Sequence, residues 1–366
     1  MISNYNVMSF NKEQPYNNLP LLLPDNSAWE TMEVYKKLAE ARAALAELKG
    51  RLPVIPNPLM LINTLVLQEA KDSSTIENIF TTNDELYKAF SSSSSNVNLS
   101  TKEVLRYREA LWSAFAKLKA PSGYSIALAV EIFKTITGRN EEIRTVQVYI
   151  GSTDRVVYTP PEQGNILTEK LNNWFDIALN NNSIDPLIKM AMLHYQFEAI
   201  HPFTDGNGRT GRILNVLFLC SQKLIDLPVI YLSKYILENK NDYYRLLREV
   251  TENGQWKDWI IYMLDAVKHT AAFTLDKVNS IYNSYLTAIE KVRTEAPEIY
   301  THELIEVIYN QPYCKIAILE EKKIASRNTA SKYLRKLEEL GILASEQVGR
   351  ETLYKNLALL RILSGT

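Results

Sequence analysis

Residues 201–212 read HPFTDGNGRTGR, and this stretch decides our prediction of both fold and chemistry. Gly206 and Gly208 flank Asn207, and two glycines so placed let the backbone adopt unusual φ values and approach a ligand closely. An apolar segment with helical character follows directly. A glycine loop that leads into a helix N-terminus offers free N–H donors and a positive dipole end, so this loop predicts a phosphate site.

The charged residues of the same stretch favour a polyphosphate. Arg209 and Arg212 are three residues apart, which places them on one face at the positive end of the helix. Such a pair is unfavourable unless an anion compensates it, and arginine binds phosphate oxygens in bidentate fashion. Asp205 adds the hard carboxylate that proteins use for Mg²⁺ beside phosphates. His201 can accept a proton, since its ordinary pKa is about 6.5.

Length and composition indicate an ordinary globular protein. The 366 residues predict two or three domains, and 46% of them are hydrophobic and 23% charged. The net charge of −1 argues against a global basic field for nucleic acid or anionic lipid. Cys220 and Cys314 show no metal spacing and predict no disulfide framework. No apolar stretch suits a signal peptide or a membrane span, so we expect a cytoplasmic protein without membrane contact.

Helical patterns dominate the chain, with one exception. We expect helices over 29–48 and 59–70, a helix start at 72–78, a flexible loop at the serines 91–95, and mostly helices over 102–271. Asp185-Pro186 predicts the N-cap and first residue of a helix that runs into His201. The exception is 146–158, where alternating residues around a turn at 151–154 predict a β-hairpin closed by Pro160-Pro161.

The C-terminal section, 298–366, predicts a winged helix-turn-helix. Helical segments at 303–309, at 316–325 and from Ser326 to Leu340 precede two short strands, 342–345 and 353–355, around Gly349. Residues 299–366 contain ten Lys and Arg and eight Asp and Glu. Because duplex affinity depends on phosphate neutralisation, this mild basic excess leaves both DNA binding and protein docking open.

Residues 201–212 resemble the signature of the Fic family, His-Pro-Phe-x-Asp/Glu-Gly-Asn-Gly-Arg-x-x-Arg, at every specified position. The resemblance implies a mainly α fold, a Fic-type helical bundle with a β-hairpin flap and a C-terminal winged helix-turn-helix. It implies an N-terminal region over 1–100, a catalytic domain over 101–275 and a winged-helix domain over 290–366. The implied activity is protein adenylylation, the transfer of AMP from ATP to Ser, Thr or Tyr hydroxyls.

The resemblance also implies a role for each site residue. His201 would deprotonate the hydroxyl, and Asp205 would hold Mg²⁺. The phosphates of ATP would be bound by the remaining loop residues, Gly206, Asn207, Gly208, Arg209 and Arg212. The hairpin at 146–158 would align the target protein as an added strand. Asn239 and Tyr244 would lie beside the adenine.

Residues 73–78 resemble the inhibitory pattern of the family, Ser/Thr, three residues, Glu, then Gly or Asn. The implied inhibitory helix lies near 72–80, with Ser73 and Glu77 in the pattern and Glu77 paired with Arg212. The alternative interpretation of the same residues is a plain helix N-terminus, which any capping box would explain.

Other functions fit the same motifs. One is a DNA-binding regulator whose Fic domain only senses a nucleotide. Others are Fic enzymes that use another nucleotide or a phosphocholine donor, or that remove AMP. Self-modification and a homodimer are compatible with the sequence, which does not reveal the target protein.

Overall fold

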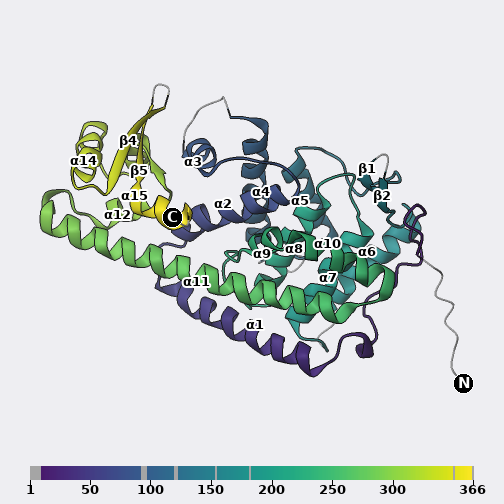
Figure 1. Ribbon diagram of the computed structural model, residues 1–366. Coiled ribbons are helices and arrows are strands. Elements are labelled where there is room, and N and C mark those ends of the chain that lie inside the picture. Colours follow the sequence, from purple (N-terminus) through teal and green to yellow (C-terminus); the bar gives the residue numbers. More distant parts are fainter. Residues whose placement is uncertain are drawn as a thin grey trace, which may run out of the picture.

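The computed structural model describes residues 10–91, 97–118, 123–152, 155–180, 183–348 and 351–364 (Figure 1). The described part is mainly helical, as expected. Its α-helices are α1 Met32–Arg51, α2 Leu59–Ile76, α3 Asn83–Ser91, α4 Leu99–Lys117, α5 Ile126–Thr137, α6 Asn165–Asn180, α7 Pro186–Ile200, α8 Asn207–Ser221, α9 Leu232–Glu238, α10 Lys240–Asn253, α11 Trp256–Glu295, α12 His302–Tyr309, α13 Ile316–Glu321, α14 Arg327–Glu339 and α15 Leu357–Ser364. Its strands are β1 Ile150–Ser152, β2 Arg155–Tyr158, β3 Tyr313–Cys314, β4 Leu343–Val348 and β5 Glu351–Asn356.

Helices α7 and α8 form the centre of the larger part of the molecule. Helix α7 is buried on nearly all sides, which suits its almost continuous apolar sequence. Its N-terminus is as predicted: the Asp185 side chain accepts from the Leu187 N–H at 2.8 Å, and Pro186 is the first helical residue. Six residues separate α7 from α8, so the loop at 201–206 is held between two buried helices.

The 40-residue helix α11 runs along the molecule, from the helical core around α7 and α8 to the C-terminal elements (Figure 1). Helix α1 packs lengthwise against α11, and ion pairs join the two at Lys37–Asp265 (2.8 Å) and Glu40–Lys268 (2.9 Å). The expected gap between domains, 275–290, lies inside α11, so the helical core and the C-terminal elements share a continuous helix. The domain limits themselves stay a prediction.

The C-terminal elements follow the order expected for a winged helix, α12, β3, α13, α14, β4 and β5. The three strands form an antiparallel sheet in the order β3-β5-β4. This unit contacts helix α3, where Lys88 pairs with Glu346 at 2.7 Å. Its assignment as a winged helix stays a prediction. The expected turn residue Gly349 lies outside the described residues.

Two local predictions are wrong. Residues 72–78 do not start a helix, because α2 continues from Leu59 to Ile76 and Glu77 is its C-cap. The polar residues fit inside the helix because Thr75 donates its hydroxyl to the Lys71 carbonyl (2.8 Å) and Ser73 faces a buried partner. The first hairpin strand starts at Ile150 rather than Val146, since side chains rather than a partner strand bind the 146–149 backbone. Residues 92–95 of the serine run and residues 153–154 of the predicted turn lie outside the described residues.

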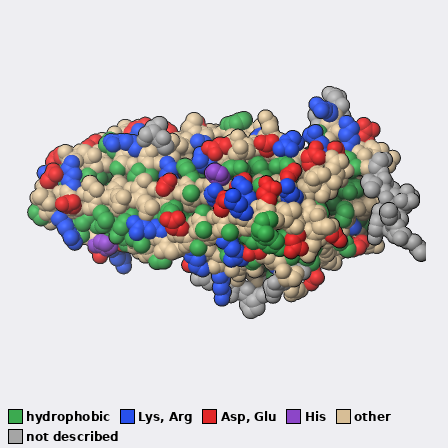
Figure 2. Space-filling model, turned by 60° about the horizontal axis from the view of Figure 1, so that its bottom comes forward, with side chains coloured by type: hydrophobic (Ala, Val, Ile, Leu, Met, Phe, Trp, Pro, Cys, Tyr) green, Lys and Arg blue, Asp and Glu red, His purple; other side chains and the backbone are tan. Residues whose placement is uncertain are grey.

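The surface shows no large single-sign area on the face drawn in Figure 2, where acidic and basic side chains alternate with apolar ones. This matches the near-zero net charge of the chain. Among the described residues, no helix is both long enough and apolar enough to span a bilayer.

We predict that Asp185→Ala lowers the free energy of unfolding by about 1 kcal/mol, because α7 loses its N-cap. Asp185→Asn keeps a side-chain acceptor for the Leu187 N–H and is the matched control, although both variants lose the ion pair with Arg42. Urea unfolding followed by circular dichroism measures the difference. Equal destabilisation by both substitutions would assign the effect to the ion pair instead of the cap.

Candidate active site

Two connected cavities meet at the loop between α7 and α8. The larger has a volume of about 570 Å³ and the smaller about 440 Å³. Both are lined by Glu77, His201 and Gly208, so the three residues mark the junction of two arms. The smaller arm contains Asp205, Gly206, Asn207 and Arg209. The structure therefore brings the predicted loop residues, Glu77 and Arg212 to one site.

His201 is the C-cap of α7 and lies in the left-handed region with φ 50°. Its ring Nδ1 is 3.2 Å from the Glu198 carbonyl oxygen. Because a carbonyl only accepts, Nδ1 carries the proton and Nε2 is left as the basic nitrogen. Burial lowers the pKa of His201 to about 4. The imidazole is therefore neutral at pH 7 and able to take a proton.

Arg144 fixes the backbone on which His201 sits. Its Nε donates to the His201 carbonyl at 2.8 Å, and its other guanidinium nitrogens donate to carbonyls of Val146, Ile200 and Pro161. Its backbone N–H donates to the Pro202 carbonyl at 2.9 Å. One buried side chain thus joins the end of α7 to both ends of the hairpin. The sequence carried no signal for this role, since a lone arginine before a hairpin is ordinary.

The loop is shaped by two further contacts. Phe203 stacks on Phe133 with ring centroids 4.4 Å apart and an interplanar angle of 3°. The Asn207 amide accepts from the Phe203 N–H and donates to the Phe203 carbonyl, each at 2.9 Å. Its side chain is therefore committed to the loop backbone, and the group it presents to a ligand is its N–H. Gly206 is the N-cap of α8 with φ 67°, a conformation that strains any residue with a Cβ.

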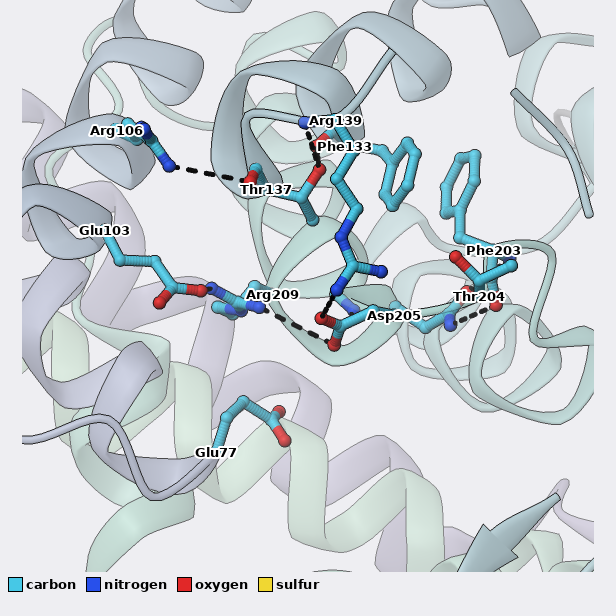
Figure 3. Close-up of polar contacts among 12 residues, drawn as sticks. Glu77, Glu103, Arg106, Phe133, Thr137, Arg139, Phe203, Thr204, Asp205 and Arg209 are labelled. Carbon is cyan, nitrogen blue, oxygen red and sulfur yellow. Dashed lines mark hydrogen bonds and ion pairs between the residues drawn. The ribbon is translucent and has the colours of Figure 1, made fainter. Parts of the chain in front are cut away.

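Asp205 and Arg209 face the smaller arm (Figure 3). Asp205 is half-exposed, and its Oδ1 accepts from the Gly206 N–H at 2.6 Å. The guanidinium of Arg209 is buried and forms an ion pair with Glu103, while its Nη2 lies 3.8 Å from Asp205 Oδ1. The first N–H groups of α8 point into the same region, since a helix N-terminus leaves them without intrahelical acceptors. Carboxylate, cation and N–H donors together suit a metal-bound polyphosphate.

Arg212 is buried, and its hydrogen-bond partners among the described residues are Ser73 of α2 and Glu77, the C-cap of that helix. Its Nε donates to Ser73 Oγ at 2.8 Å, and its Nη2 donates to the Ser73 carbonyl at 2.9 Å and to Glu77 Oε1 at 2.7 Å. Burial opposes ionisation of Glu77, but the charge and hydrogen bond of Arg212 outweigh it and lower the pKa of that carboxyl. The predicted Glu77–Arg212 contact is therefore present as an ion pair.

Gly208 explains why Glu77 can reach this position. A Cβ at residue 208 would lie 2.4 Å from Glu77 Oε1 and 3.0 Å from Arg212 Nη1. The absence of a side chain on the first turn of α8 thus leaves room either for the carboxylate or for a ligand, but the two would overlap.

The larger arm has a different character. Its lining includes Tyr244, whose predicted place beside the adenine stays a prediction, together with Tyr243 and Leu247 from α10. Asn239 is not among the lining residues; it lies between α9 and α10, and its amide donates to the Tyr235 carbonyl at 3.0 Å. Glu198, three residues before His201, also lines this arm, and burial raises its pKa to about 7. Sequence reasoning missed Glu198, which a search one helical turn before the histidine would have found.

Three family models match the chain. Residues 123–219 match the Fic/DOC family, residues 35–116 the Fic/DOC family N-terminal region, and residues 285–359 the C-terminal domain of SoFic-like protein adenylyltransferases. Together they cover the larger part of the chain.

Curated relatives match a shorter stretch. The protein adenylyltransferase Fic of Drosophila grimshawi is 30% identical over 132 residues, which span 35% of this chain and 24% of the relative. The protein adenylyltransferase fic-1 of Caenorhabditis elegans is 35% identical over 135 residues, which span 36% of this chain and 23% of the relative. The match thus spans about a quarter of the length of these relatives.

Solved structures share the fold. A Fic family protein from Desulfovibrio desulfuricans G20 superposes with a TM-score of 0.58 over 94% of this chain and 98% of its own, at 16% identity. Residues 134–508 of Fic-1 from C. elegans superpose with a TM-score of 0.51 over 65% of this chain and 71% of that one, at 20% identity. At these identities the similarity shows that the helical fold is of the Fic type.

We predict that the imidazole of His201 titrates near pH 4, because burial disfavours its charged form. The midpoint can be followed by NMR of histidine-labelled protein, with His201→Gln assigning the resonance. A midpoint near the ordinary value of about 6.5 would mean that the ring is solvated and not held as a neutral base.

Proposed function

We propose, from the match of residues 35–116 and 123–219 to the Fic/DOC family, that the protein transfers AMP from ATP to a Ser, Thr or Tyr hydroxyl of a protein. One observation carries the proposal: His201, with its Nδ1 against the Glu198 carbonyl, lines both the arm at the N-terminus of α8 and the arm with aromatic side chains. A base at that junction suits a reaction at the phosphorus that joins a polyphosphate to a nucleoside.

The residues divide the reaction between them. Nε2 of His201 takes the proton of the attacking hydroxyl as its oxygen bonds to the α-phosphorus, and the bond to the β-phosphate breaks, so that pyrophosphate leaves. Arg209, Arg212 and the N–H groups of Asn207 and Gly208 hold the phosphates. Positioning and charge neutralisation provide most of the rate.

The donor set of the smaller arm fits Mg²⁺. Asp205 is the half-exposed carboxylate beside the phosphate donors, and one carboxylate with phosphate oxygens is the usual way to hold this ion. The described residues contain no cluster of three His, Cys, Asp or Glu that would bind a metal by themselves. We propose that Asp205 would hold the ion together with the nucleotide, where it would neutralise charge on the phosphates.

We propose that Glu77 inhibits this reaction in the resting protein. Its carboxylate neutralises the charge of Arg212 and fills the space beside Gly208, and a terminal phosphate would need both. Productive binding of ATP then requires Glu77 to leave. The contact lies within one chain, so inhibition needs no second protein.

The hairpin is the proposed docking edge for the target. Strands β1 and β2 pair only with each other in the described structure, so their outer edges are free to accept a further strand. Val146, Tyr149 and Val157 are exposed on or beside the hairpin and add apolar contact. Main-chain pairing tolerates many sequences, so it aligns a hydroxyl without selecting one target. The same geometry allows self-modification. DNA binding by the C-terminal unit and formation of a homodimer are further proposals that do not depend on the hairpin.

We predict that Glu77→Gly raises AMP transfer at least several-fold, because Arg212 becomes free for phosphate. Intact-mass measurement of the purified variant with ATP and Mg²⁺ detects self-modification as a gain of one AMP. Glu30→Gly, a change at an exposed glutamate outside both cavities, serves as the matched control. A variant that gains no AMP on itself or on added cell extract would argue against both the inhibition and the proposed enzyme.

We predict that His201→Ala, made in the Glu77→Gly protein, abolishes transfer while ATP still binds. The substitution removes the base but leaves the phosphate donors intact. Calorimetry measures binding and intact mass measures transfer, with His269→Ala on the exposed side of α11 as control. Transfer that persists without His201 would show that another group accepts the proton.

A further inference from the structure

The larger arm of the cavity has a wall that comes from the N-terminal segment. Phe10 lines this arm, although it is 140 residues away in sequence from the hairpin and further from the α7–α8 loop. The segment that carries it passes beside β1 and β2 (Figure 1). This arm of the cavity is therefore completed by a segment that is far in sequence from both the hairpin and the loop.

The ring of Phe10 is held by an aromatic cluster. It stacks on Tyr158 with centroids 5.9 Å apart and an interplanar angle of 18°, and it meets Tyr16 edge-on at 5.3 Å. Tyr158 donates its hydroxyl to the Ala199 carbonyl at 2.9 Å, which ties the cluster to the last turn of α7. The ring therefore packs on a tyrosine that is anchored at Ala199, two residues before the histidine that we propose as the base.

Hydrogen bonds fasten the segment itself. The Tyr16 N–H donates to the Thr159 carbonyl at 3.0 Å, and the Thr159 hydroxyl donates to the Lys12 carbonyl at 2.7 Å. The Glu162 N–H donates to the Asn17 side chain at 2.9 Å. These bonds join residues 12–17 to the end of the hairpin, so the wall and the hairpin hold one another in place.

The two arms differ in a way that matches the two ends of a nucleotide. The smaller arm has one cation, Arg209, the carboxylates of Glu77, Glu103 and Asp205, and the N-terminus of α8, whose N–H groups suit phosphates. The second cation, Arg212, lines the larger arm where the two meet. Beyond Glu77, Glu198 and Arg212 at the junction, the larger arm has aromatic and aliphatic side chains from the N-terminal segment, the hairpin and α10, beside the polar Arg248 and Thr251. The apolar lining includes Phe10, Ile150, Val157, Tyr158, Tyr244 and Leu247. A flat apolar base is the part of a nucleotide that such an arm accommodates.

We infer that Phe10 is a base-contacting residue through which the N-terminal segment completes the nucleotide site. This inference rests on the proposed function and names a specificity contact within it. A flat aromatic wall of this kind favours a purine over a smaller pyrimidine, because the larger ring system covers more of it. Phe10 affects the affinity for the base and takes no part in proton transfer.

The test measures binding without turnover. In the Glu77→Gly, His201→Ala protein, the inhibitory carboxylate and the base are both removed, and calorimetry compares ATP, CTP and inorganic tripolyphosphate. We expect Phe10→Ala to weaken ATP binding about tenfold, the range typical for loss of one base–aromatic contact, and to leave tripolyphosphate unchanged. The preference for ATP over CTP should fall in parallel.

Two further variants separate contact from folding. Phe10→Tyr keeps the aromatic face and should bind ATP within about twofold of the parent, whereas Phe10→Leu keeps apolar volume and should lose affinity like the alanine variant. Phe273→Ala is the matched control, a partly buried phenylalanine of α11 outside both cavities. Unchanged ATP affinity in Phe10→Ala, or equal weakening of ATP and tripolyphosphate, would overturn the inference. Absence of ATP binding in the parent would instead contradict the proposed function itself.

Discussion

The buried guanidinium of Arg212 is the constraint on which the site depends. A charge removed from water must be paired and hydrogen-bonded, and the hydrogen-bond partners of Arg212 among the described residues are Ser73 of α2 and Glu77, the C-cap of that helix. The C-terminal end of α2 is therefore tied to a residue of α8. Glycines of α8 allow its neighbours to approach, because a Cβ at Gly208 would lie 2.4 Å from a carboxylate oxygen of Glu77 at the end of α2, and one at Gly211 would lie 2.7 Å from a carboxylate oxygen of Glu198 on α7.

The carboxyl groups around this cation are not equivalent. Burial raises the pKa of Glu69 to about 8 and that of Glu198 to about 7, whereas Arg212 lowers the pKa of Glu77. At neutral pH Glu69 is mostly protonated, Glu198 is divided between its two forms, and Glu77 is ionised. The charge of Arg212 is thus balanced chiefly by Glu77. Because the pKa of Glu77 is lowered in the folded protein, this pairing stabilises the fold above the ordinary carboxyl pKa and is lost as pH falls below it.

The sequence predicted the features that are local and missed those that depend on distant partners. The cap at Asp185-Pro186 and the loop at 201–212 were predictable because their chemistry is contained in adjacent residues. Ser73 and its neighbours resemble a helix start because such capping residues usually stand at one. Here Ser73 lies inside a continuing helix, where its hydroxyl accepts a hydrogen bond from Arg212 of α8. Arg144 and Phe10 act across more than fifty residues of chain, and nothing in their immediate sequence marks them.

The same geometry explains how the proposed inhibition could be reversed without unfolding the inhibitory helix. Glu77 is the C-cap of α2, and the chain turns away at Asn78 with φ 62°, so the inhibitory carboxylate extends from the end of the helix rather than from its middle.

Two of the three hydrogen bonds from Arg212 go to Ser73, one turn earlier in α2. If a terminal phosphate replaces Glu77, those two bonds persist and the guanidinium keeps a full set of acceptors. The phosphate then replaces the Glu77 carboxylate as the anion beside Arg212. The additional negative charge of the phosphate is neutralised by Arg209 and by the N-terminus of α8. Release of Glu77 on this account is a side-chain movement, and α2 stays in place.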